Sequence, residues 1–209
     1  MPEKKGGQLI ATGSKSCVIK PHINCKGQKI NRNNNKISKI IYGDTSKEYS
    51  LKEKKIDDII KKIPGSKKWA LIFDTLCKPP TFDESSKIDE EIFDCLGESS
   101  YELHQGKNSI KKQIFDKNSI MLIGDYGGVT LEQYFNEKMK GLDDIRIIEK
   151  NFYDIMEKMT YIFLGLHELK KHGISHLDVK PNNIVFHDGY FKFIDFGLSA
   201  KLSDIKHFK

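Results

Sequence analysis

The 209-residue chain has no long apolar segment. A membrane-spanning helix needs about 18 or more consecutive apolar residues, and no stretch approaches that length. The amino-terminal sequence MPEKKGGQ also lacks the apolar core of a secretory signal. We therefore expect a soluble, cytoplasmic protein without membrane partners.

Cysteine is scarce, and its spacing excludes the common metal-binding patterns. Cys17, Cys25, Cys77 and Cys95 form no C-x-x-C pair and have no histidine at metal-ligand spacing. The sequence therefore predicts four reduced thiols in a reducing compartment.

A strong charge imbalance is also missing. The 35 basic and 29 acidic residues give a net charge of +6 that is spread along the chain. This balance suits an anionic ligand such as a nucleotide. The sequence has no basic stripe interleaved with aromatic residues, so nucleic acid is an unlikely partner.

Reactive side chains are concentrated between His176 and Gly197, in the sequence HLDVKPNNIVFHDGYFKFIDFG. The Asp188-Gly189 pair is typical of a tight turn between two short strands, at 184–187 and 190–194. A hairpin at this place would return the chain so that Asp195 faces Asn183.

This segment resembles the catalytic loop and the D-F-G segment of eukaryotic-type Ser/Thr protein kinases. The resemblance implies that Asp178 accepts the proton of the substrate hydroxyl and that Lys180 lies against the γ-phosphate of ATP. It also implies that Asn183 and Asp195 hold Mg²⁺, whereas His176 only supports the loop.

The amino-terminal residues 9–21 (LIATGSKSCVIKP) align with the glycine-rich loop of the same family, G-x-G-x-x-G-x-V. Ala11, Gly13, Ser16 and Val18 occupy the four named places, so only the middle glycine is retained. Glycine lets the backbone approach phosphate groups closely, and we expect Gly13 and Val18 to contribute to nucleotide binding.

The next predicted strand, 36–43, carries Lys39 at the position that pairs with the α- and β-phosphates in this family, although it could also be a surface lysine. A helix should follow the Asp44-Thr45-Ser46 cap and end at Pro64-Gly65. The side of this helix that is predicted to be buried consists of Tyr49, Ile56, Ile60 and Ile63, with Glu53 among these apolar residues. A buried carboxylate is costly unless it is paired, so Glu53 is the predicted partner of Lys39.

A strand is expected at 69–73, followed by an insertion at about 78–119 that is partly helical at 88–96. The insertion is either a variable loop or a docking element. The segment IGDYGGVTL resembles the interlobe hinge, with backbone groups near Asp125 and Tyr126 facing adenine. The predicted domains are therefore a nucleotide lobe, 1–124, and a hinge with a partial second lobe, 125–209.

A single buried helix is predicted before the catalytic loop. Its apolar positions are Phe152, Ile155, Met159, Phe163, Leu166 and Leu169, and it ends at Gly173. Little sequence follows the D-F-G segment, so the resemblance implies a carboxy-terminally truncated kinase. The predicted fold class is α+β and kinase-like, with a β-rich amino-terminal lobe and the beginning of a mainly helical lobe.

The resemblance implies an ATP- and Mg²⁺-dependent kinase that acts on Ser or Thr of a protein substrate, with Lys180 as the residue typical of Ser/Thr enzymes. The alternative is a truncated kinase or pseudokinase that binds a nucleotide or a partner without phosphoryl transfer. The degraded glycine-rich loop and the insertion look like divergent kinases of large DNA viruses, which would place the chain in host cytoplasm or a virion. A separate polypeptide could complete the second lobe.

Overall fold

The computed structural model describes residues 7–13, 16–28, 35–81 and 118–205. The chain divides into two compact units, one made of 1–54 and 73–126 and the other of 55–72 and 127–209. The insertion expected at 78–119, including its helical part, falls almost entirely outside the described residues.

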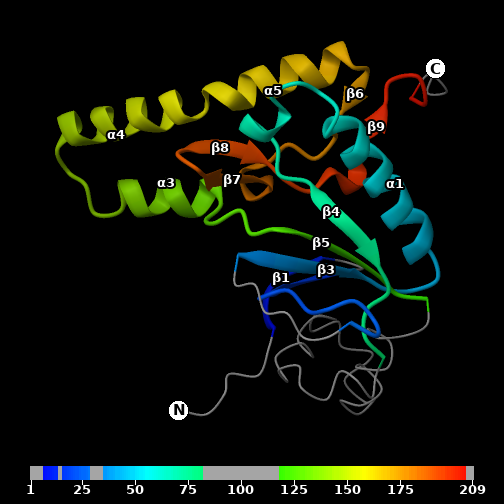
Figure 1. The fold of residues 1–209 in the computed structure, drawn as a ribbon. Helices are drawn as coiled ribbons and strands as arrows, with labels where there is room; N and C mark the ends of the chain where they lie inside the picture. The colour runs from blue at the N-terminus through cyan, green and yellow to red at the C-terminus, as the bar shows by residue number, and fades with distance from the viewer. Residues whose placement is uncertain (1–6, 14–15, 29–34, 82–117, 206–209) are drawn as a thin grey trace, which may run out of the picture. The chain divides into compact units, whose positions relative to one another are not determined.

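The first unit is built on a five-stranded antiparallel sheet with the order β1-β2-β3-β5-β4 (Figure 1). Its strands are β1 (Gln8–Gly13), β2 (Ser16–Lys20), β3 (Lys36–Ile41), β4 (Phe73–Cys77) and β5 (Ile120–Asp125). Helix α1 (Ser46–Ile60) begins in this unit and ends in the second.

The second unit contains most of the helices and two short hairpins or strand pairs. Its helices are α3 (Leu131–Met139), α4 (Ile145–Lys158) and α5 (Thr160–Lys171), with 3-10 turns η1 (Ser66–Lys68), η4 (Pro181–Asn183) and η5 (Phe196–Leu198). Its strands are β6 (Ile174–Ser175), β7 (Ile184–His187), β8 (Tyr190–Phe193) and β9 (Ala200–Lys201). A sheet region followed by helices confirms the predicted α+β class.

Strand register assigns the candidate nucleotide-binding residues to one face of the sheet. Val18 is opposite Lys39, and Lys39 is opposite Leu122. Paired residues of antiparallel strands point to the same face, and successive residues alternate. Val18 and Lys39 therefore share a face.

The other face carries an apolar cluster that the segment after β2 covers. Its buried members are Cys17, Ile19, Ile23, Cys25, Ile40, Met121 and Ile123. The backbone of Ile23 both donates to and accepts from the Ser38 hydroxyl, at 2.9 and 3.3 Å, which fastens residues 21–26 across this face.

The expectation of reduced thiols is wrong for all three cysteines that the structure describes, because Cys17, Cys25 and Cys77 are each disulfide-bonded. Cys25 and Cys77 form a disulfide, although 52 residues separate them in sequence. The Lys26 N–H donates to the Lys78 carbonyl at 2.9 Å, so the covering segment and the end of β4 run next to each other. This proximity comes from the fold and leaves no spacing pattern in the sequence.

Helix α1 buries most of the stripe predicted for it. Glu53, Ile56, Ile60 and Ile63 are all at most 4% exposed. Tyr49 is 46% exposed, so its inclusion in the buried stripe was wrong. It lies in the first turn of the helix and is not a member of the apolar cluster formed by the described residues of the first unit.

The strand expected at 69–73 lies instead at Phe73–Cys77, as β4. Trp69 is fully buried in the core of the second unit, where its carbonyl accepts from the Phe193 N–H at 2.8 Å. A Cβ on Gly165 of α5 would lie only 3.0 Å from the Trp69 ring. The tryptophan is therefore a core anchor that packs against the helix at this glycine.

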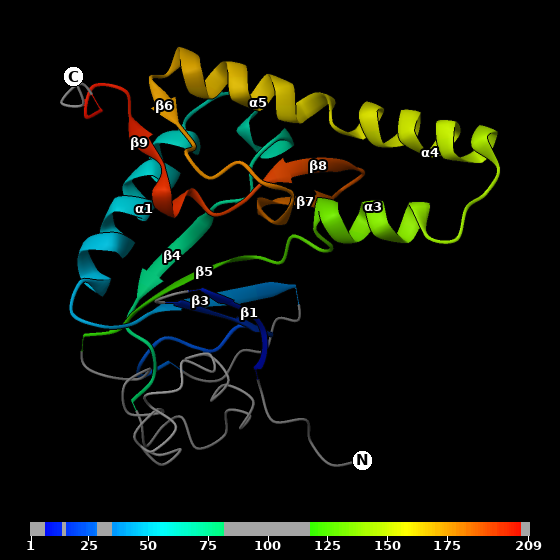
Figure 2. The same cartoon turned by 180° about the vertical axis from the view of Figure 1, so that it is seen from behind.

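The single helix predicted before the catalytic loop is two helices, α4 and α5, that meet at Met159 and continue one another (Figures 1 and 2). The buried side of α5 consists of Ile162, Gly165 and Leu169. Phe163 and Leu166, which the periodicity placed in the core, are 55% and 40% exposed. The buried residues Ile162 and Gly165 each precede a predicted core residue by one position, because α5 packs against Trp69 at Gly165.

Within the described part of the chain, no helix is both long and apolar enough to cross a membrane.

Candidate active site

The predicted hairpin after the catalytic loop is present as β7 and β8. Asp188 and Gly189 connect the strands with positive φ angles of 53° and 86°, the combination that a type I′ turn requires. Lys192 donates to the Asp188 carboxylate at 3.2 Å, which stabilises the turn. Local turn chemistry therefore sets the hairpin that supports the site.

The loop before β7 brings two of the predicted residues to the carboxylate of a third, Asp178. Lys180 Nζ lies 2.9 Å from Asp178 Oδ2, and Asn183 Nδ2 donates to the same oxygen at 2.6 Å. Asn183 Nδ2 also donates to the Asp178 carbonyl at 2.9 Å. Pro181 opens the η4 turn, with its fixed φ at a position that needs no N–H donor. Lys180 and Asn183 thus fix the orientation of the Asp178 carboxylate.

Asp195 is linked to this loop through the backbone. The Ile194 N–H donates to the Asn183 carbonyl at 3.0 Å, which aligns the residue before Asp195 with Asn183. Asp195 has a φ of 60° and accepts from the Gly197 N–H at 3.3 Å, so it caps η5. A left-handed conformation outside glycine is strained and is common at functional sites.

His176 is 3% exposed and joins the loop to the segment before Asp195. The Asp178 N–H donates to Nδ1 at 3.3 Å, so Nε2 carries the ring proton and donates to the Ile194 carbonyl at 3.2 Å. Burial lowers the pKa of His176, against smaller raising effects from the Ile194 bond and from Asp195 and Asp178. The neutral ring therefore connects two segments of the site.

Sequence reasoning missed Ser199 as a support of this loop. Its hydroxyl is fully buried and donates to the His176 carbonyl at 3.1 Å. A serine after the D-F-G segment has no local pattern that predicts this contact.

In the first unit, the structure brings Lys39 and Glu53 together. Lys39 Nζ lies 2.9 Å from each carboxylate oxygen of Glu53, and both side chains are buried. The separation of 14 residues is covered by the end of β3 and the first half of α1. Gly13 ends β1, and Val18 lies in β2 on the face of Lys39.

The hinge candidates are more constrained than the sequence predicted. The Tyr126 N–H already donates to the Asn35 carbonyl at 2.7 Å, so this donor is not available to an adenine edge. Lys20 Nζ lies 3.3 Å from the centre of the Tyr126 ring. Lys36 pairs with the Asp125 carboxylate at 3.3 Å. No sequence pattern identified Lys20, Asn35 or Lys36 as hinge contacts.

The donor set near the loop fits magnesium that is shared with a nucleotide. Among the residues that the structure describes, no three His, Cys, Asp or Glu side chains form a metal-binding group. Mg²⁺ is commonly held by one or two protein groups together with phosphates and water. Because Asn183 Nδ2 is directed at Asp178, the Asn183 Oδ1 atom is the one that can face a cation.

Comparison with known proteins agrees with this geometry. Residues 98–209 match the family model of the protein kinase domain. This match covers more than half of the chain, which therefore belongs to the protein kinase domain family. The kinase resemblance inferred from residues 176–197 is confirmed.

Curated relatives are kinases of several kinds. The chain is 33% identical over 117 residues to MAP kinase kinase kinase win1 of Schizosaccharomyces pombe, covering 54% of this chain and 7% of the relative. It is 35% identical over 78 residues to human dual specificity mitogen-activated protein kinase kinase 7, covering 37% and 17%. It is 30% identical over 91 residues to the probable serine/threonine-protein kinase PknB of Lactococcus lactis, covering 43% and 13%. The chain thus spans less than a fifth of the length of each of these relatives.

Proposed function

We propose that this chain transfers the γ-phosphoryl group of ATP to the hydroxyl of a Ser or Thr residue in a protein substrate. The observation that carries the proposal is the network in which Asp178 is contacted by both Lys180 and Asn183. Phosphoryl transfer depends on positioning and charge neutralisation more than on covalent chemistry, and this network supplies both.

Each residue of the loop has a defined role in this proposal. Asp178 accepts the proton of the substrate hydroxyl as the hydroxyl oxygen bonds to the γ-phosphorus. The bond between this phosphorus and the bridging oxygen breaks, and ADP leaves with the electron pair. Lys180 neutralises charge on the transferred group, and its contact with Asp178 orients that carboxylate. Asn183 and Asp195 would hold Mg²⁺, which when bound neutralises charge on the phosphate oxygens.

The first unit supplies the remaining nucleotide contacts. Lys39 pairs with the α- and β-phosphates, and Glu53 orients its ammonium group. Gly13 and Val18 lie against the nucleotide from the β1–β2 hairpin. At the hinge, the backbone near Asp125 faces the adenine, because the Tyr126 N–H is occupied.

The acceptor residue and the protein partners of this chain are also part of the proposed function. Lys180 favours a Ser or Thr acceptor, and one similar protein is named as a serine/threonine-protein kinase. Another is named as a dual specificity kinase, so tyrosine is the competing acceptor to test. The protein substrate and a polypeptide that completes the second lobe stay predictions.

A nucleotide-binding experiment tests the metal assignment. Mg²⁺-ATP should stabilise the wild type by RT ln(1 + [L]/Kd), about 1 to 3 kcal/mol near saturation. Asp195→Ala should lose most of this stabilisation because the metal loses its carboxylate. Asp204→Ala, the same change at an exposed position, is the matched control and should keep it. Equal stabilisation of wild type and Asp195→Ala in a thermal-shift titration would remove Asp195 from the metal site.

A further inference from the structure

A lysine-rich segment leads from α1 into the core of the second unit. Residues 55–72 contain five lysines and two aspartates, which give the segment a net charge of +3, half of the +6 of the whole chain. Asp57 is only 1% exposed, so Asp58 is the one acidic side chain that the segment presents to solvent. The exposed surface of this segment is therefore strongly basic.

Short turns after α1 fix the lysines on the outside of the fold. The Lys62 N–H donates to the Ile59 carbonyl at 3.0 Å, and further hydrogen bonds of the same i to i+3 type follow as far as Trp69. Turns of this type repeat about every three residues. The buried positions have the same spacing, and each is at most 5% exposed: Ile60, Ile63, Ser66 and Trp69.

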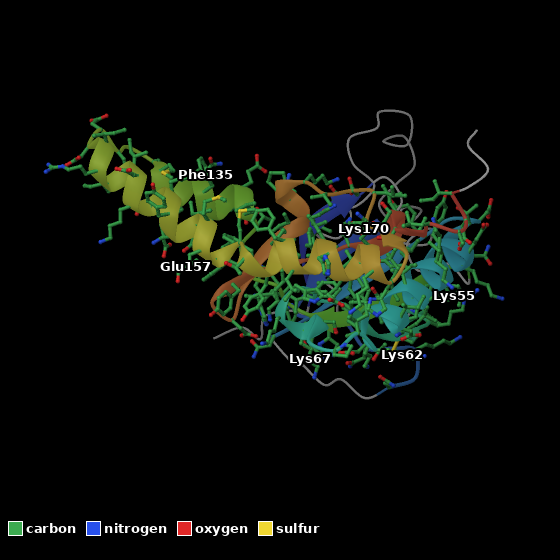
Figure 3. The ribbon with its side chains drawn as sticks, turned by 90° about the horizontal axis from the view of Figure 1, so that it is seen from above. Lys55, Lys62, Lys67, Phe135, Glu157 and Lys170 are labelled. Atoms are coloured by element: carbon green, nitrogen blue, oxygen red, sulfur yellow. A yellow bond between two sulfur atoms is a disulfide. The ribbon has the colours of Figure 1, made fainter. Side chains whose placement is uncertain are left out.

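Two lysine pairs occupy the positions between these buried residues. Lys61 and Lys62 follow α1, Lys67 and Lys68 form most of η1, and all four are exposed. Lys55 lies seven residues before Lys62, so two helical turns bring it to the same side of α1. Figure 3 labels Lys55, Lys62 and Lys67 along one side of the second unit. We call this set of five lysines the lysine surface.

Most of this positive charge is not neutralised within the second unit. The ammonium groups of Lys55, Lys62 and Lys67 have no ion pair or hydrogen bond with any residue of the chain. Lys68 lies 5.5 Å from the centre of the Tyr161 ring on α5. Other lysines of the unit each pair with an aspartate, namely Lys158, Lys180 and Lys192.

The acidic groups of the packed elements are also engaged elsewhere. Glu168 of α5 lies 3.9 Å from Lys171 and 3.7 Å from His172. Asp58 is a single carboxylate among the five lysines. A complementary anion must therefore come from a binding partner.

The residue types of the segment select the class of partner. Residues 55–72 contain no arginine, and their only tryptophan, Trp69, is fully buried. Nucleic-acid binding gains from aromatic stacking and from the bidentate contacts of arginine, and neither is present here. The segment also exposes no large apolar side chain, which a membrane-surface helix needs for insertion. Carboxylates of a protein suit these lysine point charges best.

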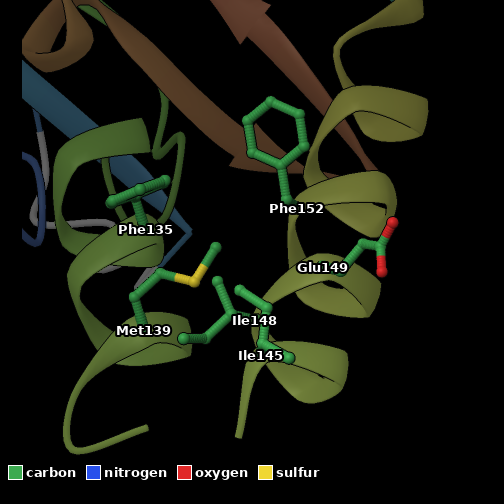
Figure 4. Close-up of a pocket in the computed structure, with 6 residues that line it drawn as sticks. All are labelled: Phe135, Met139, Ile145, Ile148, Glu149 and Phe152. Atoms are coloured by element: carbon green, nitrogen blue, oxygen red, sulfur yellow. The ribbon is translucent and has the colours of Figure 1, made fainter. Parts of the chain in front are cut away.

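An apolar pocket in the same unit is a separate feature. Figure 4 shows this pocket between α3 and α4, and none of the six residues that line it lies in the segment 55–72. Figure 3 labels Phe135 of this pocket away from Lys55 and Lys62. A partner on the lysine surface therefore gains ionic contacts without burial in this pocket, and salt should weaken its binding strongly.

We propose that the lysine surface binds an acidic segment of a partner protein, with several Asp or Glu side chains that contact Lys55, Lys62 and Lys67. Complementary charge of this kind speeds association and excludes partners of like charge. The interaction goes beyond phosphoryl transfer and is measured without ATP. Failure of catalysis would therefore leave it untouched.

Two labelled peptides test the charge preference. One alternates Glu and Ser, and the other has Gln in place of every Glu. Fluorescence anisotropy with the 209-residue chain should show at least tenfold tighter binding of the Glu peptide, a difference of about 1.4 kcal/mol. This binding should weaken at least tenfold when NaCl is raised from about 0.1 M to 1 M, because the screening length falls from about 10 to 3 Å.

Matched double variants assign the binding to the lysine surface. Lys62→Glu with Lys67→Glu should weaken the Glu peptide at least tenfold, whereas Lys62→Arg with Lys67→Arg should keep it. Lys170→Glu with Lys201→Glu makes the same charge change at exposed lysines of the same unit and should bind as the wild type does. Lys62→Gln with Lys67→Gln adds no negative charge and should also weaken binding, so a folding defect of the Glu variant leaves the test intact.

A purely structural role is the main alternative, because a lysine at the end of a helix stabilises it through the helix dipole. In that case the variants at Lys62 and Lys67 would lower the free energy of unfolding and leave binding of the Glu peptide unchanged, which would overturn the proposal. Equal binding of the Glu and Gln peptides, or equal effects of the two charge-reversed double variants, would also overturn it.

Three further measurements test the other occupants. They are binding of phosphatidylserine vesicles, binding of an oligothymidylate, and self-association of the wild type. Any of these that Lys62→Glu with Lys67→Glu abolishes, without binding of the Glu peptide, would assign the surface to a membrane, a nucleic acid or a second copy of the chain.

Discussion

His176 connects the loop that carries Asp178 to the segment before Asp195. Its two ring nitrogens connect the Asp178 amide to the Ile194 carbonyl, and only the neutral ring can make both bonds. Protonation of Nδ1 would remove the acceptor for the Asp178 N–H and would place a charge in a buried site. The lowered pKa of His176 follows from this burial.

Acid should therefore destabilise the fold through His176. In the unfolded chain its pKa has the ordinary value of about 6.5, so as the pH falls below this value the unfolded chain binds the proton first. The free energy of unfolding should fall with pH until the pH passes the lowered folded pKa. We expect His176→Gln to reduce this slope in denaturant titrations between about pH 7.5 and 5.

Exposed His167→Gln is the matched control and should keep the wild-type slope. Parallel pH curves for the wild type and His176→Gln would show that His176 does not titrate between the folded and unfolded states.

Among the elements, the contact between β3 and α1 depends on a buried ion pair. Removing one partner of such a pair leaves an uncompensated charge, at a cost of about 3 to 5 kcal/mol. Glu53→Leu should therefore lower the free energy of unfolding by about this amount. The double variant Lys39→Met with Glu53→Leu should recover most of the loss, because an apolar pair needs no compensating charge.

The same double variant separates stability from ligand binding. It should remain folded in circular dichroism yet lose most of the stabilisation by Mg²⁺-ATP, because Lys39 is the proposed phosphate contact. Retention of the wild-type nucleotide shift in the double variant would contradict the role of Lys39.

The elements differ in how far their sequences predict them. The β7–β8 hairpin could be predicted to within a residue, since Asp188 and Gly189 specify the turn locally. The buried side of α5 could not, because it depends on the fit of Gly165 against Trp69, which is distant in sequence. The predicted strand at 69–73 failed for the same reason: the apolar run is a core anchor, and β4 begins only at Phe73.

In the candidate site, too, local motifs could be predicted from the sequence and contacts between distant residues could not. The motif spacing predicted Asp178, Lys180, Asn183 and Asp195 as site residues, and all four lie in the second unit. The supports of the site, Ser199 at the loop and Lys20 and Asn35 at the hinge, make long-range contacts that have no sequence pattern.

At the scale of the whole molecule, the Cys25–Cys77 disulfide sets a covalent constraint on the first unit. The two cysteines are separated by 52 residues in sequence, and a cross-link that closes a loop of this length stabilises a fold by about 4 kcal/mol in the chain-entropy model. Cys17 is also disulfide-bonded, so reduction should lower the free energy of unfolding by at least this amount. Cys25→Ser with Cys77→Ser should already be destabilised and should lose less on reduction.

Alkylation mass spectrometry checks the bond directly. Cys25 and Cys77 should resist alkylation in the native protein and react after reduction. Alkylation of both before reduction would show that the disulfide is absent in solution.

Transfer of labelled phosphate from γ-labelled ATP to a generic basic protein tests the proposed activity most directly. The 209-residue chain should incorporate label into serine or threonine of the acceptor in a magnesium-dependent manner. Asp178→Asn should reduce the rate by about 10² or more, the usual contribution of a general base, whereas Asp204→Asn should not. No transfer by the wild type, or equal transfer by the wild type and Asp178→Asn, would contradict the assignment of phosphoryl transfer to this site.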